Sequence, residues 1–303
     1  MLKIGVLGIG DIAKKAYLPV LSQIPEVELV LCTRNKDTLR ELCLKYQIKE
    51  SYTCIDEFIH SQLSGVFITV ATEMHFELSK KILSHGIPLH LDKPISTNFE
   101  QCEILVSLAK ETQTPFYVGF NRRFAPQIKI CADIGNPKLI VYQKNRTNEA
   151  ADYKTLLFDD FIHVIDTTRF LMNVPIKKIT SEVIFTHKKK VRCVIVNFYS
   201  DNAHAVCIMN YENGIDEETI EISYDNQKRI IRNLSEIETF ENNERITKKT
   251  SDWVSTLNKR GFEQMCSAFI QALQNTDSSS VSAEDALVSH RIVNDIYLEH
   301  LQE

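Results

Sequence analysis

The chain has 303 residues, of which 44% are hydrophobic and 25% are charged, which is the composition of a globular protein with room for two domains. Its net charge of -5 gives no support to nucleic-acid binding, which leaves a basic face on a protein. No apolar run reaches the roughly 18 residues of a membrane span, and the start, MLKIGVLGIG, reads as a strand rather than a signal peptide. We therefore expect a cytoplasmic protein without a membrane or nucleic-acid partner.

Short apolar runs alternate with helical patterns through the first third of the chain. Such alternation is typical of a parallel sheet covered by helices on both faces. The expected strands are 3–9, 27–33, 52–53, 65–71, 88–92 and 115–120. The expected helices are 11–24, with a break at Pro19 as an alternative, then 36–46, 77–84 and 99–112.

After residue 120, strands follow one another with little helix between them. This change predicts a second domain of α+β type with a largely antiparallel sheet. Its expected strands are 138–146, 178–186, 191–199, 203–211, 218–224 and 228–234. Its expected helices start near Pro126 and cover 159–172, 261–274 and 283–301, with a polar loop at 275–282 and Ser282 as an N-cap. We predict an α/β protein with a Rossmann domain at 1–120 and a second domain at 121–303, whose last helix is a candidate to pack back on the first.

Eight cysteines are scattered along the chain, and none forms a CxxC pair. Zinc sites and redox motifs depend on such pairs, so we assign no metal to the protein. Reduced, mostly buried thiols are typical of a cytoplasmic protein.

The stretch GIGDIA, residues 8–13, follows a strand and opens a helix, the context in which a GxGxxA pattern indicates dinucleotide binding. Gly8 permits a tight turn, and Gly10 lets the backbone approach a pyrophosphate. Asp11 and Ile12 start the helix whose N-terminus faces the phosphates. The alternative is a strand-to-helix turn that binds nothing.

Two further strand ends are candidates for the cofactor site. The second strand ends at Thr33 and Arg34, where an NAD-binding domain usually carries an acid, so the pair favours the 2′-phosphate of NADP, with a solvated arginine as the alternative. After the fourth strand, Ala71 and Thr72 can line the cofactor crevice. His75 is a cofactor candidate too, although a hydrogen-bonded histidine at a helix start is the simpler interpretation.

A lysine follows the fifth strand in the stretch HLDKPIS, residues 90–96. Ligands bind at the carboxyl edge of such sheets, so Lys93 can hydrogen-bond the substrate oxygen during hydride transfer. Asp92 precedes it, and Pro94 fixes the backbone after it. A surface turn is the alternative. The sequence does not establish the geometry of the Lys93–Pro94 peptide bond, and trans is the commoner form.

The helix FDDFIHVID, residues 158–166, places Asp159 and His163 at positions i and i+4 of one face, with Asp166 one turn further. A carboxylate beside a histidine orients the ring and suits a general base, which contributes roughly 10²–10⁴-fold in rate. Such pairs are also common on helices without a function.

In this order, the pieces resemble the Gfo/Idh/MocA family of nicotinamide-dependent oxidoreductases over nearly the whole chain, and its MviM-like subgroup in particular. The matching stretches are GIGDIA, DKP at 92–94, GFNRRFAP at 119–126, DDFIH at 159–163 and SAEDAL in the last helix. The chain departs from the family pattern at Asp92, where the motif has Glu, and at Tyr17, where many members have His. Aspartate is one methylene shorter than glutamate, so we expect Asp92 to hold the cofactor or Lys93 more loosely.

The resemblance implies NADP or NAD as cofactor and a sugar, polyol or related hydroxy compound as the small-molecule substrate. It implies that Lys93 binds substrate and the nicotinamide end, that His163 is the general base and that Asp159 positions it or the substrate. Asn121 becomes a further cofactor contact. The open sheet of the second domain often forms the oligomer interface in this family, so we expect a homo-oligomer.

Four basic residues are candidate contacts for an anionic or hydroxylated substrate, with structural ion pairs as the alternative: Arg122, Arg123, Lys144 and Arg146. The sequence thus predicts a dehydrogenase or reductase of a secondary alcohol or ketone. A cofactor-binding sensor without catalysis is the rival from another class, and a reductase of an unsaturated or aromatic ring compound is a third possibility.

Overall fold

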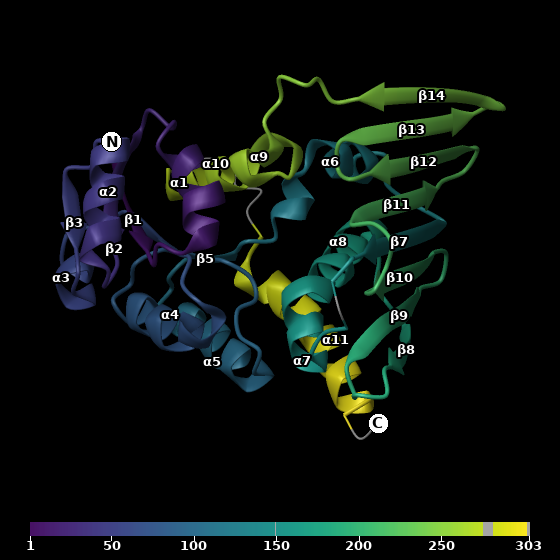
Figure 1. Ribbon diagram of the computed structural model, residues 1–303, viewed down its shortest axis with the longest axis horizontal. Coiled ribbons are helices and arrows are strands. Elements are labelled where there is room, and N and C mark those ends of the chain that lie inside the picture. The colour runs from purple at the N-terminus through teal and green to yellow at the C-terminus, as the bar shows by residue number, and fades with distance from the viewer. Residues whose placement is uncertain (149, 275–280, 302–303) are drawn as a thin grey trace. The chain divides into compact units, whose positions relative to one another are not determined.

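The computed structural model describes residues 1–148, 150–274 and 281–301, which form two compact units (Figure 1). Unit 1 comprises Met1–Phe120 and Phe262–His290, and unit 2 comprises Asn121–Gly261 and the chain from Arg291 onward. The sequence prediction placed the boundary at residue 120, with the last helix as a candidate to pack back on the first domain. In the structure the whole segment Phe262–His290, which includes the start of that helix, belongs to unit 1. Most of the predicted polar loop, residues 275–280, lies outside the described residues.

The described residues of unit 1 form a six-stranded sheet in the order β3-β2-β1-β4-β5-β6, with all neighbours parallel. The strands are β1 (Leu2–Leu7), β2 (Val27–Cys32), β3 (Glu50–Tyr52), β4 (Gly65–Ile68), β5 (Leu89–Leu91) and β6 (Phe116–Val118). Strand order reverses between β1 and β4, and ligands of doubly wound folds bind at such a switch point, outside the carboxyl ends of the strands.

Helices cover this sheet. They are η1 (Ala13–Tyr17, a π-helix), α1 (Leu18–Leu21), α2 (Lys36–Tyr46), α3 (Ile55–Ile59), η2 (Thr72–Met74), α4 (His75–Ser84), α5 (Phe99–Glu111) and α10 (Phe262–Leu273). Helix α4 packs on α5, whereas α1 packs on α10 (Figure 1). Pro19 does not break the first helix, since the helical backbone continues from η1 through α1, and the winding changes from π to α just before the proline.

Helix α10 returns to the sheet after about 140 residues of unit 2. The ring of Phe269 lies 4.9 Å from that of Phe67 on β4 and 5.5 Å from that of His90 on β5. Its side chain also approaches Gly65, where an added Cβ would lie 3.1 Å from the Phe269 ring. Burial against three strand positions explains why this helix belongs to unit 1.

The described residues of unit 2 form an eight-stranded sheet in the order β14-β13-β12-β11-β7-β10-β9-β8. Only the β7–β10 pair is parallel, and the others are antiparallel. The strands are β7 (Leu139–Asn145), β8 (Lys178–Phe185), β9 (Val191–Tyr199), β10 (His204–Asn210), β11 (Glu217–Ser223), β12 (Gln227–Arg232), β13 (Glu236–Glu241) and β14 (Glu244–Lys249). The last two were not predicted, because β14 is exposed along its whole length and is charged rather than alternating.

The helices of unit 2 are η3 (Asn121–Phe124), α6 (Pro126–Ala132), α7 (Tyr153–Thr155), η4 (Leu156–Phe161, a π-helix), α8 (Ile162–Met172) and α9 (Thr256–Lys259). Helix α8 is buried on most of its surface and packs on β7 and β10. The last helix, α11 (Ala283–Glu299), contributes residues up to His290 to unit 1 and the rest to unit 2. Its predicted cap is confirmed, since the Asp285 N–H donates to Ser282 Oγ at 3.3 Å.

All eight cysteines are free thiols, five of them buried. Within the described residues, no helix combines the length and the hydropathy that crossing a bilayer requires.

Candidate functional site

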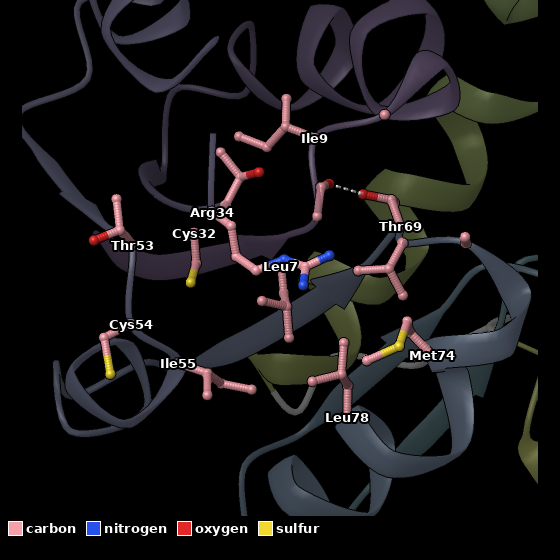
Figure 2. Close-up of a pocket in the computed structure, with 15 residues that line it drawn as sticks. Leu7, Ile9, Cys32, Arg34, Thr53, Cys54, Ile55, Thr69, Met74 and Leu78 are labelled. Atoms are coloured by element: carbon pink, nitrogen blue, oxygen red, sulfur yellow. Dashed lines mark hydrogen bonds between the residues drawn. The ribbon is translucent and has the colours of Figure 1, made fainter. Parts of the chain in front are cut away.

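A pocket of about 610 Å³ opens at the carboxyl edge of the unit 1 sheet, around the ends of β1, β2 and β4 (Figure 2). It therefore lies at the switch point of the strand order. Its lining residues are Leu7, Gly8, Ile9, Gly10, Cys32, Thr33, Arg34, Thr53, Cys54, Ile55, Thr69, Val70, Ala71, Met74 and Leu78.

The glycine loop has the shape of a phosphate cradle. Gly8 has φ +87°, and a Cβ there would lie 2.2 Å from Cγ1 of Val70 and 2.9 Å from its Cα, so only glycine fits. A Cβ on Gly10 would meet only the carbonyl oxygen of Thr69, at 4.0 Å, so this backbone borders open space. Thr69 Oγ1 donates to the carbonyl of Gly8 at 2.6 Å and holds the loop against β4 (Figure 2). These features fit a dinucleotide pyrophosphate.

The end of β2 supplies the only charged side chain among the lining residues, Arg34 (Figure 2). Thr33 lines the same end. The lining set contains no carboxylate, so the acid that usually binds the ribose hydroxyls of NAD has no counterpart here.

Among the lining residues that the sequence prediction did not name, Thr53, Cys54 and Ile55 form one continuous segment. They follow β3, which pairs with β2 and ends at the same edge of the sheet. The signal for them was their position after a strand, but this strand has three residues and no apolar run.

The helix start beside the pocket is solvated. Asp11 is exposed and forms an ion pair of 2.7 Å with Lys15, whose ammonium lowers the pKa of the Asp11 carboxyl. Ile12 is the N-cap of η1. Neither residue lines the pocket, so their contribution to the site comes from the backbone at the helix start.

His75 is completely buried at the start of α4. Its Nδ1 lies 2.7 Å from the carbonyl oxygen of Pro94, and its Nε2 lies 3.2 Å from that of Val70. Both oxygens can only accept, so a ring with one N–H donates to one of them, and Nδ1 makes the shorter contact, with Pro94 in the turn after β5. His75 is therefore a hydrogen-bonded histidine at a helix start, the simpler of the two interpretations of the sequence. Ala71 lines the pocket, and Thr72 opens η2 next to it.

Asp92 and Lys93 follow β5, the neighbour of β4, at the same carboxyl edge. Both are partly exposed, and the Lys93–Pro94 peptide is cis rather than the commoner trans form. The Tyr17 hydroxyl donates to Oδ1 of Asp92 at 2.8 Å. Burial raises the pKa of the Asp92 carboxyl, and the charge of Lys93 and the Tyr17 hydrogen bond oppose that rise.

In unit 2, the predicted histidine base is buried near the start of α8, and Asp159 is exposed in the preceding π-helix. The sequence prediction assumed one regular α-helix from 159, but residues 156–161 are wound as a π-helix, so α-helical i,i+4 spacing does not describe the pair. Asp166 accepts from Arg123 through both oxygens, at 2.6 and 2.8 Å, so its carboxylate is committed to an ion pair.

Two of the basic candidates form buried ion pairs. Arg122 donates to both oxygens of Glu218, at 2.6 and 3.0 Å, and Lys144 Nζ donates to Oδ1 of Asp160 at 2.8 Å. The side chains of Arg122 and Lys144 are only 7% and 1% exposed, so both residues form structural ion pairs, the alternative to a substrate contact. Tyr211 donates to the second oxygen of Asp160 at 2.6 Å.

Burial shapes the titration of this cluster. It opposes the ionisation of Glu218, yet the Arg122 guanidinium outweighs it and holds the pKa of that carboxyl at about 2. Burial and the nearby Arg122 charge lower the pKa of Lys144 to about 8, although Asp160 resists the change.

Arg146 differs from the other candidates, because it lines a cavity of about 380 Å³, whose other charged lining residues are Arg260, Asp216, Glu217 and Glu218. In the part of the chain that the structure describes, no carboxylate lies within ion-pair distance of either guanidinium. Asn121, predicted to bind the cofactor, is buried in η3, and its Nδ2 donates to the backbone carbonyl of Arg260 at 2.8 Å.

The parallel sheet, the glycine loop and the pocket at the switch point define a dinucleotide-binding protein of the Rossmann type. Residues 2–120 match the model of the oxidoreductase family with an NAD-binding Rossmann fold, and residues 127–243 match the YceM-like C-terminal domain. The chain belongs to the Gfo/Idh/MocA family of oxidoreductases, and its cofactor is NAD or NADP. The recognition of the family and the predicted fold class are thus confirmed.

Relatives extend over the whole chain. A Gfo/Idh/MocA family oxidoreductase from Vibrio cholerae superposes with a TM-score of 0.94 and 30% identity, covering 100% of this chain and 99% of the other. The dehydrogenase MviM from Clostridium difficile gives 0.92 and 29%, covering 98% and 99%. YceM of Salmonella typhimurium is 27% identical over 100% of this chain and 99% of its own. A more distant relative, the scyllo-inositol 2-dehydrogenase (NAD(+)) of Bacillus subtilis, is 23% identical over 69% of this chain and 64% of its own.

Proposed function

We propose that the protein is an NADP(H)-preferring dehydrogenase or reductase that acts on a secondary alcohol or ketone of a sugar, polyol or related hydroxy compound. The observation that carries this proposal is that the dinucleotide pocket and Lys93 lie at the same carboxyl edge of the unit 1 sheet. The relationship to a scyllo-inositol dehydrogenase supports the substrate class.

The nicotinamide ring supplies or accepts the hydride when the cofactor is bound. In the proposed mechanism, the Lys93 ammonium donates a hydrogen bond to the substrate oxygen and stabilises the charge that develops there. His163 takes the hydroxyl proton during oxidation and returns it during reduction, and Asp159 positions His163 or the substrate. Arg146 is the remaining candidate for a substrate contact, because it borders a cavity and forms no ion pair in the described residues.

The pocket residues Gly8, Gly10, Thr33, Arg34 and Ala71 form the proposed binding site of the dinucleotide. Beyond the pocket, we keep five further cofactor contacts as part of the proposal: Asp11, Ile12, Thr72, Asp92 and Asn121. His75 acts in it through Val70 and Pro94 rather than by touching the cofactor.

The preference for NADP(H) rests on Arg34. Its guanidinium is the one charged group in the lining, and a guanidinium pairs well with a phosphate. A titration with NADPH and NADH, followed by nicotinamide fluorescence, tests it. We expect Arg34→Ala to weaken NADPH binding by roughly 10- to 100-fold and to leave NADH binding within a few-fold, since a charge-assisted hydrogen bond contributes about 1.5–3 kcal/mol.

Arg40→Ala is the matched control, because Arg40 is an exposed arginine of α2 outside the pocket. Tighter binding of NADH by the native protein would contradict the 2′-phosphate interpretation and leave the rest of the proposal standing. Binding of neither nucleotide by the folded protein would overturn the pocket assignment as well.

Catalysis is tested by a screen of inositols, sugars and hydroxy acids with each cofactor, followed by Lys93→Ala and His163→Asn in the responding assay. We expect both variants to lose at least about 100-fold in kcat, the scale of a general acid–base group. His163→Asn should bind NADPH normally, whereas Lys93→Ala should bind it more weakly, because Lys93 is also a proposed contact of the nicotinamide end. The double variant shows whether the two residues act on the same substrate, because its loss is then smaller than the product of the single losses. Undiminished biological activity of Lys93→Ala would favour a sensor without chemistry.

We further propose a cytoplasmic homo-oligomer that associates through the open face of the unit 2 sheet. Four half-buried apolar side chains form adjacent cross-strand pairs there, Val141 with Val206 and Ile195 with Ile208. Light scattering after gel filtration tests the assembly. Ile208→Lys should give a folded monomer, and a native protein that is monomeric at all concentrations would refute the proposal.

A further inference from the structure

The turn that carries Lys93, residues 92–95, is bonded by three buried side chains from three different helices. They are Tyr17 in η1, His75 in α4 and His290 in α11, each with 0% exposure. We call these three residues the clamp. The three bonds go to Asp92 Oδ1, to the carbonyl oxygen of Pro94 and to the N–H of Ile95, so the clamp holds the turn without using the Lys93 side chain.

The first contact joins the two positions at which the sequence departs from its family. The Tyr17 hydroxyl donates to Oδ1 of Asp92 at 2.8 Å. Its ring is fixed by three aromatic neighbours, with centroids 5.7 Å from Phe67, 6.0 Å from His90 and 5.8 Å from Phe262. Gly119 makes room for the pair, since a Cβ there would lie 2.8 Å from the Tyr17 hydroxyl and 3.2 Å from Oδ1 of Asp92. The shorter acid therefore has a long, rigid partner.

The second contact uses His75. The carbonyl oxygen of Pro94 can only accept, so His75 Nδ1, at 2.7 Å, is the donor. This bond fixes the residue that directly follows Lys93.

The third contact fixes the tautomer of His290. The backbone N–H of Ile95 can only donate, so His290 Nε2, at 2.9 Å, carries no proton and accepts. Its Nδ1 then carries the proton and lies 2.8 Å from the carbonyl oxygen of Ala286, one turn earlier in α11. A neutral imidazole in this one tautomer satisfies both bonds.

We propose that Tyr17, His75 and His290 are positioning residues that set the direction of Lys93 for hydride transfer. The inference rests on the catalytic role of Lys93 proposed above. A lysine side chain has four rotatable bonds, so a fixed backbone on both sides of it restricts where its ammonium can lie. Misplacement of a catalytic group by about 1 Å can cost about 100-fold in rate.

Paired variants test the clamp, because glutamine can replace one of the histidine bonds and leucine cannot. In His290→Gln, the amide oxygen can accept from the Ile95 N–H, whereas His290→Leu leaves that donor without an acceptor. Tyr17→Phe removes only the hydroxyl and keeps the ring contacts. His85→Leu is the control, since His85 is an exposed histidine of unit 1 outside the clamp.

The first readout needs neither substrate nor cofactor. Hydrogen exchange of the peptide that covers residues 92–97 is measured by mass spectrometry on the free protein. We expect exchange to rise at least tenfold in His290→Leu and in Tyr17→Phe, and to return to within about threefold of the native rate in His290→Gln. Unchanged exchange in both loss variants would overturn the clamp, whatever the protein catalyses.

The second readout uses NADPH and the substrate found in the screen. We expect His290→Leu and Tyr17→Phe to lower kcat about 10- to 100-fold, with NADPH affinity and the substrate KM within about threefold, and His290→Gln to restore kcat. A loss that appears only in parallel with a fall in Tm, and that His290→Gln shares, would mean a structural role and refute positioning. If Lys93→Ala is fully active while exchange responds as expected, the proposed function fails and the contacts of the clamp stand.

Discussion

His90 makes the stability of unit 1 sensitive to acid. The residue is 2% exposed on β5, between the rings of Phe67 at 4.8 Å and Phe269 at 5.5 Å. Within the described residues, its Nδ1 is buried without a hydrogen-bond partner. Burial lowers the pKa of this imidazole to about 3, so it is neutral in the folded protein at any moderate pH.

The pH dependence follows from linkage. The unfolded histidine has a pKa of about 6.5, so between about pH 6.5 and pH 3 the unfolded state binds a proton that the folded state does not. Stability is therefore lost as the pH falls through this window. Between pH 7 and pH 5, the loss from His90 alone is about 2 kcal/mol, since each pH unit below the unfolded pKa contributes about 1.4 kcal/mol.

The perturbation is His90→Phe, which keeps a ring and removes the proton site. Urea unfolding at pH 7 and pH 5, followed by circular dichroism, should show that the variant loses about 2 kcal/mol less than the native protein over this interval. Phe269→Leu is the control, because it loosens the same contact without a titrating group and should lower stability equally at both pH values. Equal losses in the native protein and in His90→Phe would refute the reasoning.

Three further changes test other parts of the molecule. Arg122→Leu leaves Glu218 buried without its partner and should cost about 3–5 kcal/mol in urea unfolding, while the double change with Glu218→Leu should recover most of that loss. Gly8→Ala strains a φ of +87° and sets a Cβ against Val70, so NADPH fluorescence titration should show binding weakened more than about tenfold in a folded protein. Asn35→Ala removes the N-cap of α2 and should cost about 1 kcal/mol without changing NADPH affinity; a loss below about 0.3 kcal/mol would mean that the cap is not stabilising.

The features predicted well from the sequence are those that a short stretch of chain determines. Gly8 and Gly10 are recognisable because a strand ends before them and a helix follows, and both line the pocket. Thr33, Arg34 and Ala71 were found in the same way, as residues at strand ends of one sheet edge. The period of two in β9 and β10 likewise gave those strands almost to the residue.

The features missed depend on contacts between distant residues. The bond from Ile95 to His290 spans 195 positions, and no local pattern indicates it. Arg122 was predicted to contact the substrate, because its ion-pair partner Glu218 lies 96 positions away and the sequence around Arg122 does not reveal it. Strand β14 was not predicted, because it is stabilised by pairing with β13 and by cross-strand ion pairs and has no apolar face of its own.

The place of β7 in the unit 2 sheet has a consequence for how that unit is assembled. Strands β8, β9 and β10 form one series of hairpins, and β11 to β14 form another. Within each series, the paired strands are neighbours in the sequence. Strand β7 is made before either series and joins them, parallel to β10 and antiparallel to β11. Local hairpins form faster than pairings between distant segments. A ribosome-bound chain therefore carries β7 with both edges unpaired until β10 and β11 emerge, which makes this strand the point at which synthesis exposes the unit to wrong pairing.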